Sequence, residues 1–163
     1  MRVPFVCTAI LLTGLAWHQG AVAQLNEKFS DLTGEIEMLR SMAQVERQAI
    51  VADAMLLTGE EAAAFWPVYR EYREAVARIN DRLLKVVSDY GAQREALTDA
   101  QAKELLADYF DYEQDMLKTR KQYVARFGKA LPMTKVTRFY QIDNKLDVIL
   151  RLALAVHVPL AKQ

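Results

Sequence analysis

Cysteine is almost absent from this sequence, and histidine is scarce. The 163 residues contain one cysteine, Cys7, and two histidines, His18 and His157. A disulfide framework needs paired cysteines, and a zinc site normally draws on several Cys or His ligands. We therefore expect neither a metal nor another cofactor, and we expect the stability of the fold to come from packing alone.

The chain also lacks an excess of charge of either sign. Its 21 Lys and Arg residues balance 21 Asp and Glu residues. A protein that binds nucleic acid or an anionic membrane surface usually carries a basic excess. We therefore expect no nucleic-acid partner and no electrostatic attraction to lipid.

Motifs of known catalytic chemistry are missing as well. Ser30, Ser41 and Ser88 have no nucleophile-elbow context, and the sequence has no glycine-rich phosphate loop and no HExxH pair. We therefore expect no catalytic residue, and an enzyme on a helical scaffold is a remote alternative.

The first 23 residues have the layout of a secretory signal peptide. Arg2 precedes an apolar stretch from Val3 to Trp17, and the small residues Ala21 and Ala23 follow it. The stretch is shorter than the roughly 20 residues of a membrane-spanning helix. We expect export to the periplasm with cleavage after Ala23, without stable membrane insertion afterwards. A polar lead-in over 24–33 and a single helical domain over 34–163 follow.

Apolar residues recur at steps of three and four through most of that domain, which predicts an all-α fold. We expect helices at about 34–56, 59–90, 99–127 and 133–158, arranged as a small bundle or an open array of long antiparallel pairs. Gly91, Gly128 with Pro132, and Pro159 are the expected stops, and Pro67 predicts a bend in the second helix. The first helix carries a stripe at heptad spacing: Met38, Met42, Val45, Ala49, Ala52 and Leu56.

Two segments forty residues apart repeat the same pattern. Leu57-Thr58-Gly59-Glu60-Glu61 is matched by Leu97-Thr98-Asp99-Ala100-Gln101. A threonine followed three residues later by Glu or Gln is a capping box, in which each side chain binds the backbone amide of the other residue. The repeat therefore predicts two helix starts, and helix capping alone explains the residue types.

The two Leu-Thr-x-x-Glu/Gln motifs behind a signal peptide also resemble the LTxxQ-motif family of periplasmic proteins, which includes the Spy and CpxP envelope-stress chaperones. The segments 65–72 and 139–147 resemble a proteobacterial branch of that family. The resemblance implies a four-helix, cradle-shaped homodimer that binds unfolded or misfolded periplasmic proteins without ATP. An alternative that it implies is an inhibitor of a membrane sensor kinase, bound to the periplasmic domain of that kinase. The sequence departs from the family in Glu61, where the family often has Gln, and in its lack of basic charge.

Two sets of residues are candidates for binding surfaces. Aromatic and basic residues of the second and third helices would contact a client protein, although the rings equally suit a helical core and the cations a solvated face. These residues are Trp66, Tyr69, Arg70, Arg73, Tyr109, Tyr112 and Arg120. Ile149, Leu152 and Val156 belong to an unusually apolar last helix, which predicts burial either in the core or in a dimer interface.

Overall fold

The computed structural model describes residues 46–161, and this part of the chain is helical without any strand. Residues 46–55 form a helical segment, and α2 follows over Gly59–Gln93. A short 3-10 turn, η1 (Arg94–Ala96), leads to α3 (Asp99–Ala130) and then α4 (Met133–His157). The all-α prediction is confirmed. The predicted signal peptide, the lead-in, and Met38, Met42 and Val45 lie outside the described residues.

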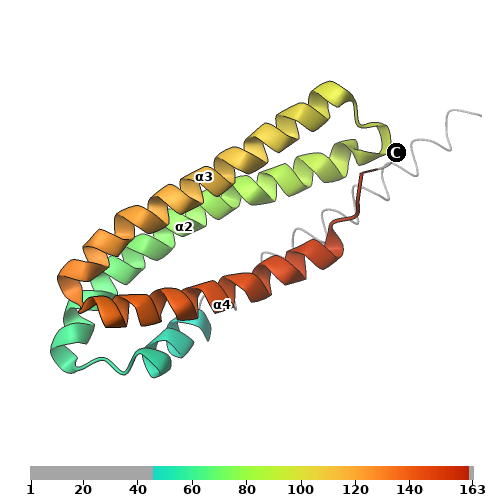
Figure 1. The fold of residues 1–163 in the computed structure, drawn as a ribbon. Coiled ribbons are helices and arrows are strands. Elements are labelled where there is room, and N and C mark those ends of the chain that lie inside the picture. The colour runs from blue at the N-terminus through green and yellow to red at the C-terminus, as the bar shows by residue number, and fades with distance from the viewer. Residues whose placement is uncertain (1–45, 162–163) are drawn as a thin grey trace, which may run out of the picture.

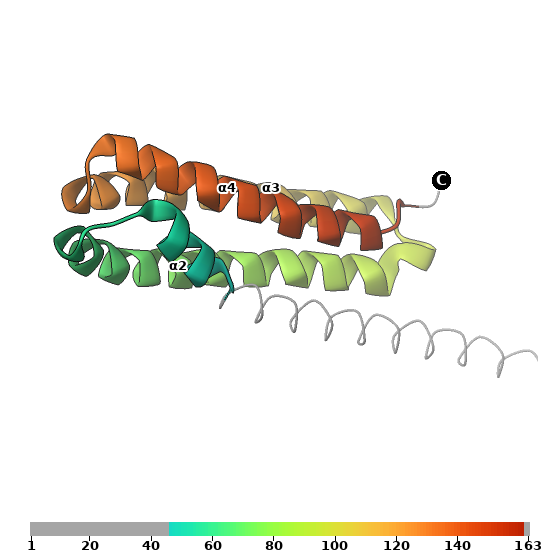
Figure 2. The same cartoon turned by 90° about the horizontal axis from the view of Figure 1, so that it is seen from below.

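Helices α2 and α3 form a long antiparallel hairpin, and α4 turns back from the end of α3 (Figure 1). At the end where α3 passes into α4, the segment 46–55 packs beside both α2 and α4, as Figure 2 shows from below. This end is called the base. At the opposite end, α4 lies further from the hairpin and finishes near the α2–α3 connection.

Both predicted capping boxes are present. The Thr58 hydroxyl accepts from the Glu61 amide at 3.3 Å, and the Thr58 amide donates to Glu61 Oε2 at 2.9 Å. Thr98 and Gln101 make the same pair of bonds, at 3.3 and 3.0 Å. Each box satisfies two amides that a helix start would otherwise leave without a partner.

Prolines follow the ends of α3 and α4, and the glycines predicted as stops do not mark helix ends. Helix α2 passes through Gly91, which is buried, and α3 passes through Gly128, so the stops predicted at these glycines are wrong. Leu131 and Val158, which precede Pro132 and Pro159, have extended backbones with ψ of 154° and 108°. A proline ring disfavours the helical conformation of the residue before it. Inside α2, in contrast, the chain stays helical on both sides of Pro67.

The core of the base is aromatic. Phe65, Tyr72, Phe127 and Phe139 are all but inaccessible to solvent, and the rings of Phe127 and Phe139 lie 4.6 Å apart between centroids. Most neighbouring ring pairs are tilted or edge-to-face, the arrangement that aromatic quadrupoles favour. The rings come from α2, α3 and α4, so this core joins all three helices at one end.

The segment 46–55 uses a different face from the one its apolar spacing predicts. Its buried residues are Arg47, Val51 and Met55, whereas Ala49 and Ala52 are exposed. The prediction that the heptad stripe is the packed face is therefore wrong for this part of the chain. The reason is Arg47, whose ion pairs with α4 turn its own side of the segment inward.

Leu56 ends this segment in a left-handed conformation, with φ of 48°, although its side chain is 74 % exposed. A left-handed backbone costs a residue with a Cβ about 1–2 kcal/mol, and glycine almost nothing. We expect Leu56→Gly to raise the free energy of unfolding by about 0.5–1 kcal/mol, because relief of strain exceeds the added entropy of the unfolded chain. Urea unfolding monitored by circular dichroism measures this change. Leu117→Gly, inside α3, is the matched control and should lower stability by about 1 kcal/mol.

Glu61 does more than close its capping box, because its carboxylate also pairs with Lys135 of α4. The hydrogen bond from Lys135, followed by that from the Thr58 amide, lowers the pKa of Glu61 below its ordinary value of 4.5. A carboxyl whose pKa is lower in the folded state stabilises the fold above its unfolded pKa, and loses that effect as the pH falls through the folded pKa.

We expect Glu61→Gln to be less stable than the wild type at pH 7, although Gln keeps the capping bond. The difference should shrink as the pH falls from the unfolded-state pKa of Glu, about 4.3, through the lowered pKa of Glu61 in the folded protein. Urea midpoints between pH 3 and 7 measure it. Glu60→Gln removes a charge from the same turn without an ion pair to α4 and serves as the control. A difference that stays constant down to pH 3 would contradict a role for the Glu61 charge.

Candidate functional site

A cluster of buried charges lies beside the aromatic core of the base. Arg47, with a side chain 2 % exposed, donates from Nη1 to Asp143 Oδ1 and from Nη2 to Asp147 Oδ1, each at 2.7 Å. Arg120 of α3 pairs with the other oxygen of Asp147, and Arg73 of α2 lies 3.6 Å from Asp143. We call these three arginines and two aspartates the ionic cluster. It joins the segment 46–55 and all three long helices.

Tyrosine hydroxyls complete the cluster. Tyr72 donates to Asp143 Oδ2 at 2.6 Å, and Tyr140 donates to the backbone carbonyl of Arg120 at 2.9 Å. Burial, and then the charge of Asp147, raises the pKa of Asp143 against the opposing effects of Tyr72 and the arginines. Burial and the Asp143 charge also raise the pKa of Tyr72 far above its usual range, so Tyr72 keeps its proton and remains a donor. The cluster therefore joins the helices of the base, and Tyr72 remains a hydrogen-bond donor to Asp143.

An apolar groove of about 550 Å³ lies at the other end of the molecule, between α2, α3 and α4. Its volume is within the range of about 300–1,000 Å³ typical of ligand-binding pockets. The groove is lined by Leu83, Val86, Val87, Tyr90, Leu97, Ala102, Leu105, Leu106, Tyr109, Tyr112, Glu113, Arg151, Leu154, Ala155, Val158 and Ala161. The sequence predicted several of these as apolar helix positions, but it did not indicate that they surround an open space.

The polar groups of the groove are few. Arg151 of α4 donates to Glu113 Oε1 of α3 at 3.2 Å, and the Tyr109 hydroxyl donates to the same oxygen at 3.3 Å. Near the end of the chain, Tyr90 donates to the backbone carbonyl of Pro159 at 2.9 Å. Leu97, which precedes the second capping box, also lines the groove, so this threonine–glutamine box places an apolar wall residue as well as a helix start.

The predicted client-binding residues fall into three groups. Tyr109 and Tyr112 line the groove, although Tyr112 is buried in its wall. Arg70 is exposed on α2, and Trp66 is partly buried against Phe65 at the base. Tyr69 is buried in the aromatic core, so its assignment to a client surface is wrong. Arg73 and Arg120 lie in the ionic cluster with side chains 17 % and 25 % exposed, and their assignment to a client surface stays a prediction.

Ile149, Leu152 and Val156 are exposed on α4, each with more than half of its surface in contact with solvent. Their prediction as core residues of the single chain is therefore wrong. The reason is geometric, because the aspartates of the ionic cluster and the groove residues Leu154 and Val158 occupy the sides of α4 that face the other helices. The predicted dimer interface stays a prediction.

Two further classes of site were sought over residues 46–161. No helix there has an apolar stretch long enough to cross a membrane. That part of the chain also contains no group of three or more His, Cys, Asp or Glu side chains that could hold a metal ion.

Comparison with known proteins found no matching family model, no matching curated protein and no matching solved structure. The resemblance to the LTxxQ-motif family therefore stays a prediction. The groove is the candidate functional site on its geometry alone.

The ionic cluster makes a direct prediction. We expect Asp143→Ala to lower the free energy of unfolding by about 3–5 kcal/mol, because Arg47 would keep a buried charge with only part of its neutralisation. Asp53→Ala, at an exposed position of the same segment as Arg47, is the control and should change stability by at most about 0.5 kcal/mol. Urea unfolding measures both variants.

The combined variant Arg47→Met/Asp143→Leu separates loss of the ion pair from loss of packing. It should recover much of the stability, since apolar side chains of similar volume replace both charges. If Asp143→Ala lowers the free energy of unfolding by less than about 1 kcal/mol, solvent must reach Arg47.

Proposed function

We propose that this protein binds apolar segments of non-native polypeptides, as an ATP-independent chaperone of the periplasm. The observation that supports this function is the apolar groove, which is open at the surface and is lined by side chains of three helices. Apolar side chains that leave water on binding contribute about 25 cal/mol for each Å² buried. A groove of this size gives modest affinity and rapid exchange, which suits transient capture.

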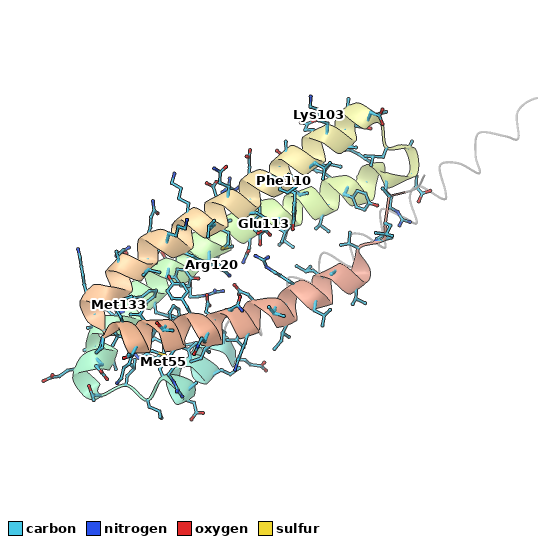
Figure 3. All side chains as sticks on the ribbon, in the orientation of Figure 1. Met55, Lys103, Phe110, Glu113, Arg120 and Met133 are labelled. Atoms are coloured by element: carbon cyan, nitrogen blue, oxygen red, sulfur yellow. The ribbon has the colours of Figure 1, made fainter. Side chains whose placement is uncertain are left out.

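The surface around the groove supports the same function. Leu106 and Tyr109 line the groove and are themselves exposed, and Phe110 is exposed next to them on α3 (Figure 3). Apolar surface that monomers leave open commonly marks an interaction site. The proposal keeps the predicted export through residues 1–23. Inhibition of a sensor kinase is the alternative that the resemblance implies, and no feature of the described surface favours it.

The function is tested by aggregation of an unfolding client protein, measured by light scattering at several stoichiometries. We expect the wild type to suppress aggregation. Leu106→Asp should require about fivefold more protein for half suppression, since a charge at the groove removes part of a leucine contact worth about 1 kcal/mol.

Leu117→Asp is the matched control, because Leu117 lies on the same helix, outside the groove, and is exposed to a similar extent, 55 % against 58 % for Leu106. It should behave as the wild type. Equal loss in the two variants would show that the groove is not the binding surface, and the absence of suppression by the wild type at any ratio would reject the chaperone proposal.

A further inference from the structure

The ion pair in the groove has hydrogen-bonding capacity that the described residues leave unused. Glu113 Oε1 accepts both the Arg151 and the Tyr109 bonds, while Glu113 Oε2 and the other guanidinium nitrogens of Arg151 bind nothing in the described part of the chain. The two side chains stay accessible, with 35 % of Glu113 and 41 % of Arg151 exposed. One free acceptor and several free donors thus lie side by side.

This pair lies at the inner end of an otherwise apolar surface. Glu113 follows Tyr112, the deepest ring of the groove, and it lies on the side of α3 that faces α4 (Figure 3). Arg151 is one helical turn beyond Asp147 of the ionic cluster, where α4 begins to line the groove. An occupant that lies along the groove therefore meets a donor and an acceptor together.

Occupants of different chemistry would use this pair differently. An acyl chain has no polar group along its length, and an amphipathic helix satisfies its own backbone amides. An extended chain still carries peptide N–H and C=O groups, and leaving them without partners in an apolar groove is unfavourable. Its N–H matches the free carboxylate oxygen, and its C=O matches the free guanidinium nitrogens.

We propose that Glu113 and Arg151 recognise one residue of an extended segment, whose C=O and N–H lie on the same side of the chain, with Arg151 donating to that carbonyl and Glu113 Oε2 accepting from that N–H. This inference rests on the proposed function and deepens it, because it defines the client as an extended apolar chain rather than a helix or a lipid. The opposite charges of the pair cancel, so the groove selects for backbone conformation and not for acidic or basic side chains.

Amide-to-ester substitution tests the inference, because an ester keeps the shape of the peptide unit and removes its N–H. The probe is a fluorescent apolar hexapeptide, whose binding to the full chain is measured by anisotropy, with each peptide bond replaced in turn. We expect one position at which the ester weakens binding about tenfold in the wild type. In Glu113→Leu/Arg151→Leu that position should no longer be sensitive.

Arg82→Leu/Asp115→Leu is the matched control, since this pair also joins two helices at the surface, at 2.6 Å, but does not line the groove. It should keep the sensitivity of the wild type. The inference is overturned if peptides bind but ester substitution weakens binding at no position. It is also overturned if palmitate or a stapled helix of the same composition binds more tightly than the extended peptide. In both cases the capture of apolar ligands would still stand. If no hexapeptide binds at all, the proposed function fails together with the inference.

Discussion

The structure depends on one buried arginine. Arg47 reaches from the segment 46–55 to two aspartates one turn apart on α4, and its pair with Asp143 is buried while its pair with Asp147 is partly buried. A buried cation is tolerated only when its charge and its hydrogen-bond donors are satisfied, so this contact determines which face of the segment is inward. It also places Asp143 against Tyr72 and so aligns α4 with α2.

The base and the groove are built from different interactions. At the base, aromatic rings and the ionic cluster hold three helices together. Toward the other end, the lining residues of α2, α3 and α4 are aliphatic or small, with a few tyrosines, and they enclose open volume. Under the proposed function, substitutions in the groove should change binding more than folding, whereas substitutions in the ionic cluster should change the stability of the fold.

Local features of the fold could be predicted from the sequence, and features that depend on distant partners could not. The capping boxes at Thr58 and Thr98 and the helix ends before Pro132 and Pro159 follow from neighbouring residues alone. The burial of Arg47 and Asp143 could not be predicted, because the two residues are 96 positions apart in the sequence. Apolar periodicity also assigns charged residues to the surface. The spacing of Asp143 and Asp147, four residues apart beside Phe139, is the one signal that could have indicated it.

The hydrogen bond from Tyr90 to the carbonyl of Pro159 joins the chain just after α4 to α2 at the far end of the molecule. A neutral hydrogen bond of this kind contributes only about 1 kcal/mol, so thermal motion breaks it often. Helix α4 is therefore held firmly at the base by the ionic cluster and only weakly at its C-terminal end. Under the proposed function, movement of this end would let the groove fit polypeptide segments of different thickness while the base stays intact.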